Sequence, residues 1–94
     1  MIADHDVVVT TVDDALIRND RVLVLVGSEV MLLSLVGSEV VRVCAGGLTI
    51  TELGVHLLAV FGEPPNGASV HDQTRTVVGS LREVGVVHVT SATE

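Results

Sequence analysis

Residues 21–33, RVLVLVGSEVMLL, decide the first half of the fold. The run RVLVLV, residues 21–26, is apolar and rich in β-branched side chains, Gly27-Ser28 offers a two-residue turn, and EVMLL, residues 29–33, leads back. Two apolar runs on either side of so short a turn are typical of a β-hairpin. The sequence therefore predicts two antiparallel strands here.

A further strand should precede the hairpin and pair with it. Two segments qualify, residues 7–11 and residues 15–18, with Asn19-Asp20 as the connecting turn. Both are short and apolar enough to form a strand, so the choice between them stays open.

The hexapeptide LVGSEV occurs twice, at residues 25–30 and at residues 35–40. A second turn at Gly37-Ser38 would extend the hairpin into a meander. We favour a helix over residues 35–45, because Ser34 is a good N-cap and the helical spacing places valines on one face and polar side chains on the other. The valines are Val36, Val40 and Val43, and the polar residues are Ser38, Glu39 and Arg42.

A second helix should begin after Thr49. Thr49 and Glu52 have the spacing of a capping box, and an apolar stripe follows them. The helix should end at Gly62, since the Pro64-Pro65 pair cannot continue it.

Ser69 and Asp72 predict the start of a last helix, and Gly85 predicts its end. Residues 86–89 can add a short final strand before a polar tail, residues 90–94, which we expect to be frayed. The predicted fold is an α+β, winged helix-turn-helix-like domain in which a three-stranded antiparallel sheet precedes three helices, in the order β-β-β-α-α-α.

Composition limits the functions that such a chain can have. Its 94 residues suffice for a single domain, with a core over about residues 7–89 and frayed ends. The net charge of −7, with five arginines and no lysine, argues against nucleic acid as a partner. Scattered histidines and one cysteine, Cys44, predict no metal site, cofactor or catalytic residue. The segment up to Asp6 does not resemble a secretory signal, so a cytoplasmic location is expected.

The segments RVLVLVGSEVMLLS, TITELGVHLLAVFG and SLREVGVV, taken in this order, resemble the PqqD-like family. The similarity covers about residues 18–87 and follows small and apolar positions rather than a catalytic signature. Leu33-Ser34 matches the family's first helix start and Ala45-Gly46 its helix end, whereas serine replaces the usual asparagine and the tryptophan of the first helix is missing.

The resemblance implies a stand-alone RiPP recognition element, a domain that binds the leader of a ribosomally made precursor peptide for a separate modifying enzyme. In that family the leader lies as an extra antiparallel strand beside the third strand, in the cleft next to the third helix. Carried onto this chain, the receiving strand is Val30, Met31, Leu32 and Leu33. Either Val30 with Leu32 or Met31 with Leu33 would line the cleft, because side chains alternate between the faces of a strand.

The last helix should form the other wall of the cleft. Arg75, Val78 and Arg82 fall on a common face, where the arginines could hold an acidic leader beside an aliphatic pocket, and Gly79 would let a peptide backbone approach closely.

Two other functions remain open. One is a winged-helix DNA-binding regulator, and the other is a structural module that forms a homodimer through an edge strand.

Overall fold

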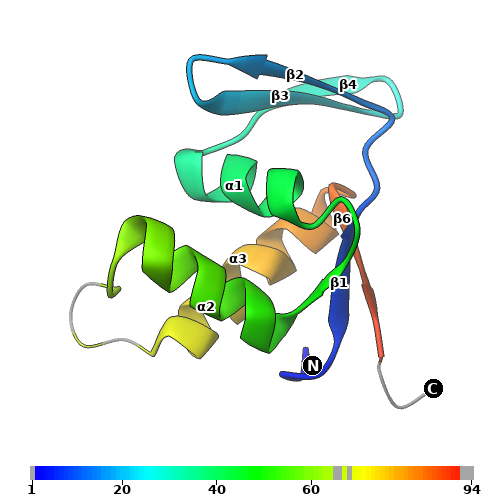
Figure 1. Ribbon diagram of the computed structural model, residues 1–94. Helices are drawn as coiled ribbons and strands as arrows, with labels where there is room; N and C mark the ends of the chain where they lie inside the picture. Colours follow the sequence, from blue (N-terminus) through cyan, green and yellow to red (C-terminus); the bar gives the residue numbers. More distant parts are fainter. Residues whose placement is uncertain (1, 65–66, 68, 92–94) are drawn as a thin grey trace.

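The computed structural model describes residues 2–64, 67 and 69–91 (Figure 1). The elements follow in the order β1 (Val7–Thr10), β2 (Asp14–Arg18), β3 (Arg21–Val26), β4 (Glu29–Leu32), α1 (Leu35–Val43), β5 (Leu48–Thr49), α2 (Ile50–Phe61), α3 (Val70–Glu83) and β6 (Val87–Thr90). They confirm an α+β fold with antiparallel sheets and three helices. The predicted β-β-β-α-α-α order matches β2 to α3 apart from the short β5, and it leaves out β1; the final strand predicted at residues 86–89 is present as β6. Strands β1, β5 and β6 form a second sheet.

The first sheet has the order β2-β3-β4 and is built from two tight turns. Asn19 and Asp20 both have positive φ, 51° and 69°, which is the type I′ geometry that short hairpins favour. Gly27 has φ of 60° in the second turn, a conformation that glycine adopts without strain. The register places Leu23 beside Leu16 on one side and beside Leu32 on the other.

The second sheet has the order β5-β1-β6 and brings the two ends of the chain together. Val8 pairs with Val89 on β6 and with Leu48 on β5. Both candidate segments for the first strand are therefore strands, but only β2 joins the hairpin. The long gap in sequence between β1 and β6 explains why local patterns did not predict their pairing.

The three helices begin where their flanking residues predict, and α2 ends at Gly62 as expected, whereas α1 ends at Val43, two residues before the predicted end. The Ser34 hydroxyl accepts a bond from the Gly37 N–H at 3.0 Å and caps α1. Thr49 and Glu52 form a complete capping box on α2. Ser69 caps α3.

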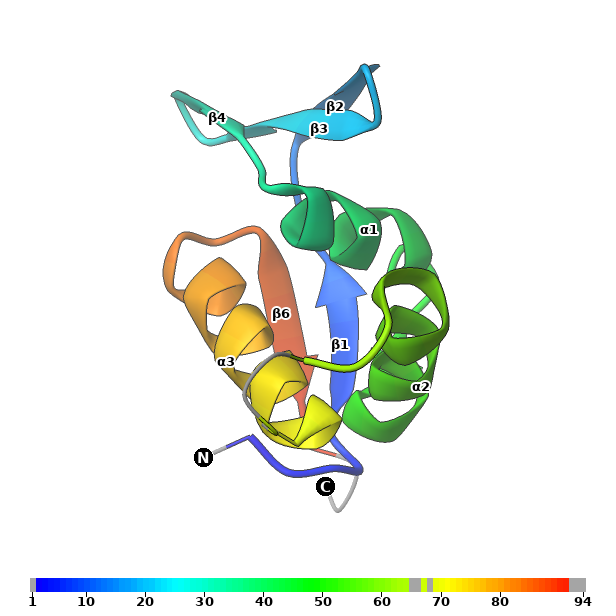
Figure 2. The same ribbon diagram turned by 90° about the vertical axis from the view of Figure 1, so that its left-hand side faces the viewer.

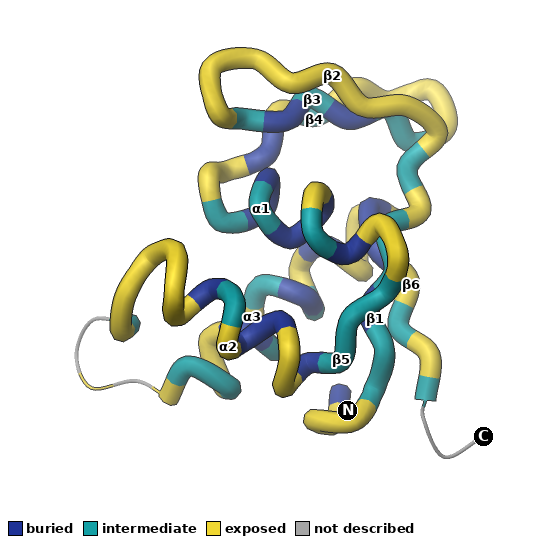
Figure 3. Tube along the Cα trace, in the orientation of Figure 1, coloured by how far each residue is buried: buried dark blue, intermediate teal, exposed yellow. Residues whose placement is uncertain are grey.

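Helix α1 lies directly against one face of the β2-β3-β4 sheet, and α2 and α3 lie beyond it, beside β1 and β6 (Figures 1 and 2). The core lies between the first sheet, the three helices and the second sheet. The tube coloured by burial shows this contrast between a buried centre and an exposed β2 (Figure 3). Val24, Val40, Leu53 and Val78 are at most 1% exposed and represent the sheet and the three helices in this core.

The N-terminal segment is packed against the domain rather than frayed. Ile2 is only 8% exposed. The carbonyl of Asp6 accepts a hydrogen bond from the N–H of Ile50, and that of Asp4 accepts one from Thr51. At the other end Thr90 belongs to β6 and pairs with Val7, so fraying does not begin there. Residues 92–94, also expected to fray, lie outside the described residues.

Candidate functional site

Strand β4 forms an open edge of the first sheet. Among the residues that the structure describes, β4 pairs only with β3. The Leu33 N–H donates to the Val22 carbonyl, which sets the alternation of hydrogen bonds along the two strands. It follows that the backbone N–H and C=O groups of Met31 point toward Val24 on β3. The backbone N–H and C=O groups of Val30 and Leu32 point the other way, out of the edge of the sheet. An extended chain could satisfy these four groups.

The side chains of the predicted receiving strand divide between the two faces of the sheet. Val30 and Leu32 are 62% and 53% exposed and lie on the face away from the helices. Met31 is half-buried against the core, and Leu33 is buried. Val30 and Leu32 therefore offer the more accessible side-chain surface, but they lie on the face of the sheet opposite to the helices and so do not line a cleft between β4 and α3.

Helix α3 lies on the same side of the molecule as β4 (Figure 2). The C-terminal end of α3 lies close to the β2-β3-β4 sheet. A Cβ on Gly85 would lie 3.1 Å from Val26 Cγ1, and a Cβ on Gly37 would lie 3.6 Å from both Leu81 Cδ2 and Leu33 Cβ. The end of α3 therefore lies next to β3 at Val26, while Gly37 of α1 lies between Leu81 on α3 and Leu33 after β4.

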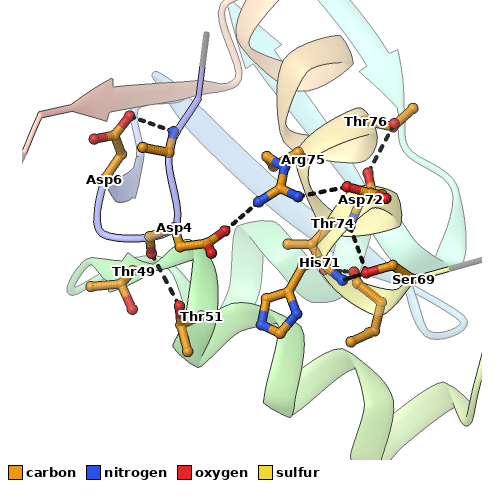
Figure 4. Close-up of polar contacts among 12 residues, drawn as sticks. Asp4, Asp6, Thr49, Thr51, Ser69, His71, Asp72, Thr74, Arg75 and Thr76 are labelled. Carbon is orange, nitrogen blue, oxygen red and sulfur yellow. Dashed lines mark hydrogen bonds and ion pairs between the residues drawn. The ribbon is translucent and has the colours of Figure 1, made fainter.

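Arg75 does not present a free guanidinium. It forms ion pairs with Asp72 on the same helix and with Asp4 of the N-terminal segment (Figure 4). The hydrogen bond from Arg75 to Asp72, with the charges of both carboxylates, raises the pKa of Arg75 above its ordinary value. Through the ion pair with Asp4, Arg75 holds the N-terminal segment against α3. The sequence did not indicate this role, because Asp4 and Arg75 are 71 residues apart.

The predicted aliphatic pocket at Val78 is wrong. Val78 is fully buried in the core and offers no surface to a ligand. Gly79 has no atom within 4 Å of the position that a Cβ would occupy. Arg82 is exposed and forms no ion pair among the described residues. Gly79 and Arg82 are therefore the accessible part of the predicted site on α3.

A second polar cluster joins α1 to α2. Glu39 accepts hydrogen bonds from Arg42 on its own helix, and its Oε2 lies 2.5 Å from Nε2 of His56 on α2. The hydrogen bond with His56, assisted by Arg42, holds the pKa of Glu39 below its ordinary value of 4.5, although burial acts in the opposite direction. Helical periodicity placed Glu39 and Arg42 on the polar face of α1, but no local signal identified His56 as a partner.

This cluster lies at a groove that sequence reasoning missed. The groove has a volume of about 390 Å³. Four exposed apolar side chains from β2, α1 and the end of α2 surround Glu39 and Arg42: Ile17, Leu35, Val60 and Phe61. These four side chains come from three separate elements, so their convergence is a product of the tertiary fold.

Cys44 is fully buried in the core, and burial raises the pKa of its thiol to about 11. Within residues 2–64, 67 and 69–91, no three His, Cys, Asp or Glu side chains are grouped so that they could hold a metal ion. None of the described helices has the length and apolar character needed to cross a bilayer.

Comparison of the chain with protein-family models, with curated proteins and with solved structures found no match.

Proposed function

We propose that this chain is a cytoplasmic, stand-alone recognition element that binds the leader of a precursor peptide and presents it to a separate modifying enzyme, with no catalysis of its own. The observation that supports this most directly is the open edge of β4, where Val30 and Leu32 direct four backbone groups outward. An extended peptide adding there as an antiparallel strand would satisfy them.

Fewer residues of α3 are available to the leader than the sequence indicated. The peptide backbone would pass close to Gly79, where no side chain obstructs it, and an acidic residue of the leader would meet Arg82. Since Arg75 is already paired with two carboxylates, Arg82 is the guanidinium that should read the leader. The leader therefore needs one well-placed carboxylate rather than an acidic tract.

The charge distribution on α3 favours a peptide over DNA. Arg75 is neutralised by Asp4 and Asp72, which leaves Arg82 next to Glu83 at the end of the helix. A helix that enters the major groove needs several free cations, because phosphate contacts supply most of the affinity.

The experiment uses fluorescently labelled peptides, each copied from the N-terminal segment of a short open reading frame that neighbours the gene of this chain. Fluorescence polarisation should identify one that binds. Leu32→Pro removes an outward N–H of β4 without touching the β3 ladder, and it should weaken binding at least about tenfold. Ile17→Pro is the matched control, since it removes an outward N–H from the other edge strand, β2, and should leave affinity unchanged.

Two further variants test the α3 wall. Arg82→Glu should weaken binding about tenfold or more, because it replaces an attraction with a repulsion. Gly79→Ala should weaken binding if the leader backbone passes over this position. Equal losses for Leu32→Pro and Ile17→Pro, or no binding of any neighbouring leader, would contradict the proposal.

A further inference from the structure

Strand β3 is apolar on both faces, although the described part of the chain covers only one. Val22 and Val24 face the helices and are buried, while Leu23 and Leu25 alternate with them on the opposite face. An antiparallel sheet with one solvated face normally alternates apolar and polar residues, and a continuous apolar run is typical of a strand covered on both sides. The sequence of β3 therefore indicates that the second face is also covered.

This outer face is a continuous apolar surface across all three strands. The registers of β2-β3-β4 place five aliphatic residues on it: Leu16, Leu23, Leu25, Val30 and Leu32. Leu16, Val30 and Leu32 are each more than half exposed. In Figure 1 the helices lie on one side of the sheet, and no described element lies on the other. Exposed apolar patches of this kind mark interaction sites.

The two ends of the outer face carry opposite charges. Arg18 and Arg21 share the face at the Asn19-Asp20 turn, whereas Asp14 lies at the far end, beside Leu25. Arg18 and Asp14 form no ion pair among the described residues, and Arg21 donates its Nε hydrogen bond to the Leu33 carbonyl. A strand rise of about 3.3 Å per residue separates Arg18 from Asp14 by about 13 Å.

We propose that a second copy of this chain covers the outer face, packed sheet against sheet about a two-fold axis that runs across the strands. Such an axis reverses the strand direction, so Arg18 meets the partner's Asp14 and Asp14 meets the partner's Arg18. The central row, Leu16, Leu23 and Leu32, then packs against its own copy. The charge pattern is self-complementary in this arrangement, which selects a second copy over an unrelated partner.

The size of the face sets the strength of the pair. Three strands at about 4.8 Å spacing and five residues at about 3.3 Å give a face of about 14 by 17 Å. The area of this face is well below the roughly 800 Å² of surface that each partner buries in a stable complex. The dimer should therefore be weak and exchange rapidly, with association visible between micromolar and millimolar protein.

Sedimentation velocity and ¹⁵N-resolved NMR over this concentration range test the proposal on the full chain. Asp14→Arg and Arg18→Asp should each raise the dissociation constant about three- to tenfold. The double variant exchanges the two charges, restores complementarity and should return to within about twofold of the wild type. Leu16→Ser should weaken association at least about tenfold, and Val55→Ser, which removes a somewhat more exposed valine from α2, should not.

The outcomes separate this dimer from edge pairing and from leader binding. The charge variants lie on β2, away from the β4 edge, so leader affinity should not change in them when it is measured at protein concentrations below those at which the dimer forms. If Leu16→Ser and both charge reversals leave the dissociation constant of the dimer unchanged, the dimer uses the β4 edge instead, and the inference is wrong. A protein that stays monomeric at millimolar concentration would also overturn it, whatever its affinity for a leader.

Discussion

The Ser38 hydroxyl accepts a 2.8 Å hydrogen bond from the backbone N–H of Val22 and so ties α1 to the central strand of the sheet. In a regular ladder the Leu33 carbonyl would accept from this N–H, but it accepts from Arg21 Nε at 2.9 Å instead. Ser38 therefore replaces a missing ladder bond at a position where its side chain is buried.

Ser38→Ala should lower the free energy of unfolding by about 1 to 3 kcal/mol, because it leaves the Val22 N–H buried without an acceptor. Urea denaturation at neutral pH measures the change. Ser80→Ala on the exposed face of α3 is the control and should change stability by less than about 0.5 kcal/mol. An equal effect of both substitutions would mean that the buried bond contributes nothing.

The Glu39 cluster makes stability depend on pH in a defined direction. Since the pKa of Glu39 is lowered in the folded protein, its stabilisation is present above the ordinary carboxyl pKa of 4.5 and is lost as the pH falls through the folded-state value. Glu39→Gln should therefore destabilise the protein at pH 7, and the difference from wild type should shrink in acid. Glu29→Gln, which changes an exposed carboxylate on β4 outside the cluster, is the control. Urea unfolding at several pH values tests this, and a constant difference would contradict it.

The Cys44 thiol should be inert in the folded protein. A pKa of about 11 against an ordinary 9.0 lowers the thiolate fraction at pH 8 about 100-fold, and the full burial of the residue adds a barrier to any reagent. Reaction with a chromogenic disulfide should be slow in buffer and fast in denaturing urea. Rapid labelling of the native protein would show that this part of the core opens readily.

Gly79 and Gly85, six residues apart, should respond in opposite ways to alanine. Gly79 lies within α3 with open space around it, so Gly79→Ala should raise stability by about 0.5 to 1 kcal/mol. Gly85 has φ of 82°, and a Cβ there would press against Val26, so Gly85→Ala should destabilise by about 1 kcal/mol or more. Thermal unfolding of the two variants gives the comparison, and a destabilised Gly79→Ala protein would contradict the open surface on α3.

The repeated hexapeptide LVGSEV shows what local sequence can and cannot predict. At residues 25–30 it ends one strand, turns at Gly27 and begins the next, while at residues 35–40 it is the first part of α1. The prediction separated the two copies correctly because Ser34 offers a cap to the second and apolar runs flank the first. Caps, turns and stripes are encoded within a few residues, so these elements could be found.

Long-range relationships were not encoded in this way. The pairing of β1 with β6, the docking of Arg75 on Asp4 and the burial of Val78 all depend on how distant elements meet. Arg75, Val78 and Arg82 do share a helical face, as predicted, but the width of the buried stripe on α3 decides which of them is accessible. Accessibility is a property of the packed helix, and periodicity alone does not give it.

The β1–β6 pairing also has a consequence for how the chain acquires its structure. Val8 and Val89, which lie side by side in the second sheet, are 81 positions apart in sequence, whereas the β2-β3-β4 hairpins connect near neighbours. Contacts between close residues form sooner than those that must close a long loop. During synthesis the two hairpins can therefore assemble early, whereas β1 has no main partner until β6 has been synthesised.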